Sequence, residues 1–106
     1  MIWRVVVRSD AQRDVAVAAQ WYEVRHEGLG GEFREAVIKV LDELSDNPLL
    51  NCRQHPRKNI RWRYPQRFPY RVIYEVIDAE GLVVVAAVLH AGCISRKGWF
   101  SRVTVR

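Results

Sequence analysis

Hydrophobic and polar residues alternate in several short segments of the chain, a pattern that is typical of half-buried β-strands. The first segment is Ile2 to Arg8, in which Trp3, Val5 and Val7 would share one face. The others lie in the second half of the chain: Asn59 to Tyr64, Tyr70 to Ile77 and Leu82 to His90. The last of them is almost wholly apolar, so we expect a central strand with both faces covered.

Two longer segments between the first and second of these strands repeat their apolar residues every three or four positions, as amphipathic helices do. In the first segment these positions are Ala11, Val15, Ala18, Ala19 and Tyr22. In the second they are Leu29, Phe33, Val37, Val40, Leu41 and Leu44. Ser9 and Gln12 have the spacing of a capping box, which predicts the start of the first helix. Gly28 predicts its end, and Asn47-Pro48 predicts the end of the second helix.

The remaining segments indicate connections. Residues 49–58 show no clear period and predict a loop, Pro65 to Arg67 predicts a turn, and Asp78 to Gly81 predicts a short hairpin connection. We therefore predict an α+β fold in a single domain over residues 1–106. A strand and an antiparallel hairpin of two helices precede a three-stranded antiparallel meander, and the helices pack on a small twisted sheet.

The chain is basic, because 17 lysines and arginines against 12 acidic residues give its 106 residues a formal net charge of +5. Much of the excess falls after residue 50, and such a surface attracts either phosphates or an acidic protein segment. Charge does not distinguish these partners. No apolar run approaches the ~20 residues that span a bilayer, and the N-terminus has no apolar signal-peptide core. We therefore expect a cytoplasmic protein without a membrane partner.

Motifs for a cofactor or a metal ion are missing from the sequence. His26 and His55 fall in predicted loops and lack the spacing of metal ligands. Gly28, Gly30 and Gly31 lie between two helices, whereas a dinucleotide-binding glycine motif follows a strand. We therefore expect neither a metal nor an organic cofactor.

Short motifs follow one another along the chain in a distinctive order. They are Ala18-Ala19-Gln20-Trp21-Tyr22-Glu23, Gly28-Leu29-Gly30 followed by Phe33, Leu44 before Asn47-Pro48, Phe68-Pro69-Tyr70, and Ala87-Val88-Leu89-His90. Each is weak alone, but their occurrence in this order resembles the RelE/ParE superfamily, which supplies the toxins of bacterial type II toxin–antitoxin pairs. The resemblance covers nearly the whole chain and favours the ParE branch.

A ParE-like identity implies a growth inhibitor that poisons DNA gyrase through protein contact, which needs no catalytic group in the toxin. The candidate target-binding residues are in the C-terminal tail: Arg96, Trp99, Phe100 and Arg102. They combine aromatic anchors with flanking charge, as interface hot spots do, although Trp99 and Phe100 could equally pack against the sheet edge. The tail departs from the family pattern, because Ala91 to Ser95 stands where ParE-like chains usually carry adjacent arginines and a proline.

The alternative within the superfamily is a RelE-like endonuclease that cuts messenger RNA on the ribosome. Such cleavage needs a group that takes a proton from the 2′-hydroxyl and cations that hold the phosphate. The residues with this chemistry are His90, Arg71, Arg61 and Arg63, provided that they share a face of the sheet. A histidine at the end of a buried strand is more often structural, so the sequence favours the docking toxin.

Both alternatives imply a cognate antitoxin, whose acidic and partly disordered C-terminal segment folds on binding and forms a hetero-oligomer with the toxin. We assign its candidate contacts to apolar and basic positions: Trp21, Tyr22, Phe33, Arg61, Arg63 and Arg71. A third interpretation is a non-toxic module that only binds the antitoxin.

Overall fold

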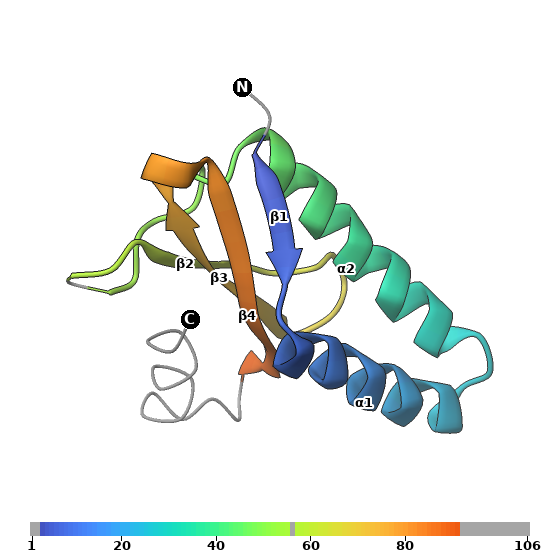
Figure 1. The fold of residues 1–106 in the computed structure, drawn as a ribbon. Coiled ribbons are helices and arrows are strands. Elements are labelled where there is room, and N and C mark those ends of the chain that lie inside the picture. Colours follow the sequence, from blue (N-terminus) through green and yellow to red (C-terminus); the bar gives the residue numbers. More distant parts are fainter. Residues whose placement is uncertain (1–2, 56, 92–106) are drawn as a thin grey trace.

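The computed structural model describes residues 3–55 and 57–91 of the chain (Figure 1). These residues form strand β1 (Arg4–Val7), helices α1 (Ser9–Arg25) and α2 (Leu29–Asp46), strands β2 (Ile60–Arg63) and β3 (Tyr70–Ile77), the 3₁₀ turn η1 (Asp78–Glu80) and strand β4 (Leu82–His90). The α+β class and the order of the elements are therefore as the hydrophobic pattern predicted. Neither described helix is long and apolar enough to cross a membrane.

The four described strands form one mixed sheet in the order β1-β4-β3-β2. The meander is antiparallel, as expected, whereas β1 runs parallel to β4 with Val5 opposite Val83. Both helices and two further strands separate β1 from β4 in the chain, so this parallel pairing has no local signal in the sequence. β4 lies between β1 and β3, which confirms the central position expected from its apolar sequence.

Both helices lie on the same face of the sheet (Figure 1), and α2 returns toward the start of β1, where the Trp3 N–H donates to the Ser45 carbonyl at 2.9 Å. The core fills the space between this helix pair and the sheet. Its helix residues are Ala11, Ala18, Ala19, Phe33, Val37, Val40 and Leu44, and its sheet residues include Val72, Tyr74, Val76, Val83, Val85 and Val88.

The opposite face of β4 is also covered. Ala86 and Ala87 are buried there with Ile60 and Ile73 in a second, smaller cluster. Both faces of this strand are therefore buried, as its apolar sequence predicted.

A bulge at Ala86 interrupts the pairing of β3 with β4. Just beyond it, the backbone N–H of Val88 donates to Oδ2 of Asp14 on α1 at 3.0 Å. Part-buried N–H groups need an acceptor. Asp14 accepts the hydrogen bond of this N–H and thereby connects α1 to β4.

The connection between the helices depends on two glycines and one glutamate. Gly28 has a φ of 87°, a left-handed conformation that glycine adopts without strain. The Glu23 carboxylate of α1 accepts the N–H groups of Gly28 at 2.9 Å and of Gly30 at 3.0 Å, so it caps the start of α2. A Cβ at Gly30 would lie 2.6 Å from the carbonyl oxygen of Ala19. The two helices can approach this closely only because position 30 carries no side chain.

The start of α1 differs from the sequence prediction. Arg8 occupies the N-cap position and no side chain caps the helix. Gln12 donates from Nε2 to the Val7 carbonyl at 3.1 Å. The predicted capping box is therefore wrong, because Ser9 already lies inside the helix. The predicted end of α2 at Asn47-Pro48 is confirmed.

Candidate functional site

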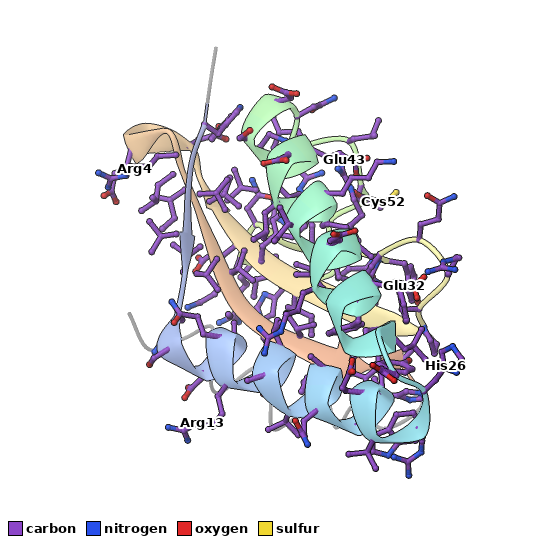
Figure 2. The ribbon with its side chains drawn as sticks, turned by 90° about the vertical axis from the view of Figure 1, so that its right-hand side faces the viewer. Arg4, Arg13, His26, Glu32, Glu43 and Cys52 are labelled. Atoms are coloured by element: carbon purple, nitrogen blue, oxygen red, sulfur yellow. The ribbon has the colours of Figure 1, made fainter. Side chains whose placement is uncertain are left out.

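The cations of the chain are concentrated in residues 47–74, which contain no acidic residue and carry Arg53, Arg57, Lys58, Arg61, Arg63, Arg67 and Arg71. Two ion pairs join this basic segment to α2, because Arg63 lies 3.3 Å from Glu43 and Arg67 lies 2.7 Å from Glu32. Figure 2 shows Glu32 and Glu43 along one flank of α2. The carboxylates of α2 thus neutralise only part of the basic segment.

Arg61 and Arg63 point from β2 toward the loop that follows α2 and hold it in place. Arg63 donates from Nε to Oδ1 of Asn51 at 2.7 Å and from Nη2 to the Asn47 carbonyl at 3.2 Å. Arg61 donates from Nη1 to the Leu49 carbonyl at 3.0 Å. The side chain of Arg63 is only 11% exposed. Both guanidinium groups are therefore engaged within the fold.

Tyr74 lies opposite Arg61 in the β2–β3 pair and contributes to the same loop contact. Its hydroxyl donates to the Pro48 carbonyl at 2.9 Å. Burial raises the pKa of Tyr74 above the ordinary value of 10.0, although the nearby charges of Arg63 and Arg61 lower it in part. The phenol is therefore protonated at neutral pH and acts as a structural hydrogen-bond donor.

Arg71 lies on the face of the sheet that the helices leave uncovered. Its guanidinium stacks over the Trp62 ring at 4.3 Å, and its Nε donates to the Tyr64 hydroxyl at 3.0 Å. Tyr64 is 50% exposed. These three side chains form an aromatic–arginine cluster that holds the guanidinium in one orientation.

His90 ends β4 on the other side of the sheet. It lies opposite Tyr70, and the two rings meet edge to face with their centroids 5.3 Å apart. With Arg13 and Trp21 it lines a shallow hollow of about 280 Å³ beside α1. Residues that lie opposite each other in a sheet project from the same face, and successive residues of a strand project from opposite faces. His90 therefore shares the face of Tyr70, whereas Arg71, the next residue of β3, projects from the other face. The candidate proton acceptor and the candidate phosphate ligand are not brought together.

The aromatic residues assigned to antitoxin binding differ in exposure. Trp21 is 48% exposed, and the Arg25 guanidinium lies 3.5 Å from the centre of its ring. Phe33 is fully buried and packs against Tyr22 and Phe68 at centroid distances of 5.4 and 5.2 Å. The assignment of Phe33 to a contact surface is therefore wrong, because its ring belongs to the core. Tyr22 is part of the same aromatic cluster.

Two apolar surfaces extend beyond the predicted contacts. The first is an α1 stripe of exposed residues, Val17, Trp21 and Val24, which recur at four- and three-residue steps; of these, Trp21 alone was predicted. The second is an apolar groove of about 430 Å³ between the helices and the sheet, lined by Val7, Gln12, Val15, Arg34, Val37, Ile38, Leu41, Val85 and Val88. The stripe was visible in the sequence as a second helical repeat. The groove arises only when separate elements pack together, so the sequence carries no signal for it.

The tail residues assigned to target binding, Arg96, Trp99, Phe100 and Arg102, lie outside the described residues. Within residues 3–55 and 57–91, no group of three or more histidine, cysteine or acidic side chains is arranged to hold a metal ion. The described part of the chain therefore offers other molecules the α1 stripe, the apolar groove, the aromatic–arginine cluster and the basic segment.

Comparison with known proteins adds a family and a fold. The sequence model of the family described as the ParE toxin of the type II toxin–antitoxin system parDE matches residues 5–92. No curated protein sequence is significantly similar to the chain.

Several solved structures share the fold. A free E. coli RelE toxin with two arginines replaced by alanine superposes with a TM-score of 0.68 and 20% identity, over 98% of this chain and 96% of that one. The RelBE2 toxin–antitoxin complex of Mycobacterium tuberculosis superposes with a TM-score of 0.59 and 21% identity, over 85% of this chain and 99% of that one. The chromosomal ParDE system of P. aeruginosa superposes with a TM-score of 0.60 and 13% identity, over 84% of this chain and 96% of that one.

Proposed function

The chain belongs to the ParE toxin family and is the toxin of a type II toxin–antitoxin system, and we propose that it stops growth by docking on DNA gyrase and is neutralised by a cognate antitoxin. Membership of the ParE family is the observation that carries this proposal. The toxin acts in the bacterial cytoplasm through protein contacts, without making or breaking a covalent bond.

The arrangement of the described residues supports docking rather than catalysis. An RNA endonuclease needs a proton acceptor and phosphate-binding cations around one reacting atom. His90 and Arg71 project from opposite faces of the sheet, and Arg61 binds a carbonyl of the loop after α2. These side chains therefore form no shared acid–base centre, whereas docking requires contact residues alone, for which Trp99 and Arg102 of the tail are our candidates.

We place the antitoxin on the α1 stripe and the apolar groove. Val17 and Val24 are 65% and 71% exposed, so a partner that covers them stabilises the folded chain by removing apolar area from water. The net charge of +5 favours an acidic partner. The RelBE2 and ParDE structures, which share this fold, are toxin–antitoxin systems, and we expect the same kind of partner here.

Induction of the chain alone in a bacterial host tests the docking proposal. We expect thymidine incorporation to fall before amino-acid incorporation, with double-strand breaks in the chromosome. The double variant Trp99→Ala/Arg102→Ala should restore growth, because it removes the aromatic anchor and a flanking charge. His90→Ala should stay toxic, because His90 takes part in no chemistry. Toxicity that depends on His90 and survives the tail variant would contradict docking.

A ribosome-dependent RNA endonuclease is the second candidate, and one observation favours it. The aromatic–arginine cluster lies on the face of the sheet opposite the two helices, and arginine beside aromatic rings is a common RNA-binding arrangement. In that case protein synthesis should fall first, transcripts should be cut, and Arg71→Gln should abolish toxicity.

A further inference from the structure

We propose that the loop between α2 and β2 binds the sugar–phosphate backbone of duplex DNA through Arg57 and Lys58, on a turn that Arg53 and His55 shape. We call residues 52–55, 57 and 58 the basic loop. The proposal does not depend on gyrase docking, because it concerns direct contact between this chain and DNA.

The basic loop is a defined turn rather than an unstructured basic stretch. Nδ1 of His55 accepts the backbone N–H groups of Arg57 at 3.1 Å and of Lys58 at 3.0 Å. Nε of Arg53 donates to the carbonyls of His55 at 3.2 Å and of Lys58 at 3.0 Å. Two side chains therefore fix the same turn, and both of them bind the backbone of Lys58. A turn that is already ordered loses less conformational entropy when it binds a ligand.

Arg57 and Lys58 of the basic loop differ in their contacts from other cations of the basic segment. Arg61 and Arg63 donate to carbonyls of the fold, and Arg67 pairs with Glu32. Among the described residues, neither Arg57 nor Lys58 forms an ion pair, and Arg57 is exposed. Lys58 is partly exposed. Two adjacent positive charges that solvent reaches attract phosphate groups over a distance of several ångströms.

The position and composition of the basic loop favour duplex DNA among the anionic polymers. Figure 1 shows the connection between α2 and β2 extending away from both helices, which leaves room for a large partner beside it. Protein interfaces usually have an apolar centre, and single strands are held by bases stacked on aromatic rings. The basic loop contains no tryptophan, tyrosine, phenylalanine or aliphatic side chain. Adjacent cations without such groups suit a phosphate backbone whose bases remain stacked inside the helix.

The test is fluorescence anisotropy of a labelled DNA duplex of random sequence, titrated with the purified full chain over a series of salt concentrations. Arg57→Ala/Lys58→Ala should weaken binding roughly 10- to 100-fold near ~0.1 M salt and reduce the slope of log K against log salt by about 1.8, since each phosphate contact contributes about 0.9. Arg34→Ala/Lys39→Ala on α2 is the matched control, because it removes the same charge from exposed helix positions. Circular dichroism confirms that both variants fold.

Each outcome decides the proposal. A severalfold weaker affinity of His55→Ala at pH 8, with an unchanged salt slope, would support the fixed turn, whereas unchanged affinity would refute it. Equal losses in the two double variants would show that only the overall charge attracts DNA. Tighter binding of single-stranded RNA, or displacement of the duplex by an equal charge of polyglutamate, would assign the basic loop to another ligand and overturn the proposal.

Discussion

Replacement of Gly30 by alanine should force α1 and α2 apart. The new Cβ would lie 2.6 Å from the carbonyl oxygen of Ala19 and 3.0 Å from Oε1 of Glu23. The first of these atoms is backbone, so a side-chain rotation cannot relieve the contact and a helix has to move. That movement would also lengthen the hydrogen bonds with which Glu23 caps α2.

The magnitude follows from three contributions. Overpacking of a tight contact costs about 1–3 kcal/mol, and partial loss of the Glu23 cap adds up to ~1 kcal/mol. The better helix propensity of alanine offsets up to ~1 kcal/mol. The net expectation for Gly30→Ala is a loss of about 1–3 kcal/mol in the free energy of unfolding, or a fall in Tm of roughly 5–20 °C for a domain of this size.

Thermal and urea unfolding followed by circular dichroism measure this effect, and the chain provides a matched control. Gly31 is the next residue of the same helix turn, but nothing lies within 4 Å of a Cβ built there. Gly31→Ala should therefore stabilise the chain by up to ~1 kcal/mol through helix propensity alone. A Gly30→Ala variant that unfolds at the same temperature as Gly31→Ala, or above it, would refute the close contact between the helices.

Further predictions concern single side chains. Asp14→Ala should lower the free energy of unfolding by about 1–3 kcal/mol, because the Val88 N–H loses its acceptor, whereas the exposed Asp42→Ala should change it by less than ~0.5 kcal/mol in urea unfolding. Burial holds the pKa of Tyr74 above 10.0 in the folded chain, so the folded state keeps the phenol proton after the unfolded state has lost it. The resulting stability is fully present below pH 10 and is lost as the pH rises through the folded pKa. Denaturation curves should show this decline, and Tyr74→Phe should make it shallower; an identical decline in the variant would refute the assignment.

Local patterns were sufficient to predict the elements but not all of their contacts. The apolar repeat that ends in Tyr22 and the one that begins at Leu29 predict both helices, because helix periodicity is a property of neighbouring residues. The Glu23 cap was not predictable, since capping rules consider residues next to the helix start and Glu23 reaches α2 from the preceding helix. The parallel pairing of Val5 with Val83 was also not predictable, because the two residues are far apart in the sequence.

The candidate site shows why register matters. The hairpin starts with Ile77 opposite Leu82, and an uninterrupted ladder would place Tyr70 opposite Leu89 and His90 on the face of Arg71. The bulge between β3 and β4 shifts the pairing by one residue, so His90 lies opposite Tyr70 and turns to the other face. The sequence indicated both strands correctly, but it carried no signal for the bulge. Whether His90 and Arg71 share a face, the condition for the nuclease alternative, therefore depended on an irregularity that only the structure reveals.

Gyrase docking is tested most directly with purified components. The purified chain is added to DNA gyrase and supercoiled or relaxed plasmid, and in parallel to ribosomes engaged on a messenger RNA. We expect stabilised gyrase–DNA cleavage and loss of supercoiling with the wild-type chain and with His90→Ala, and neither effect with Trp99→Ala/Arg102→Ala. Unchanged gyrase activity together with cut messenger RNA would contradict the docking mechanism.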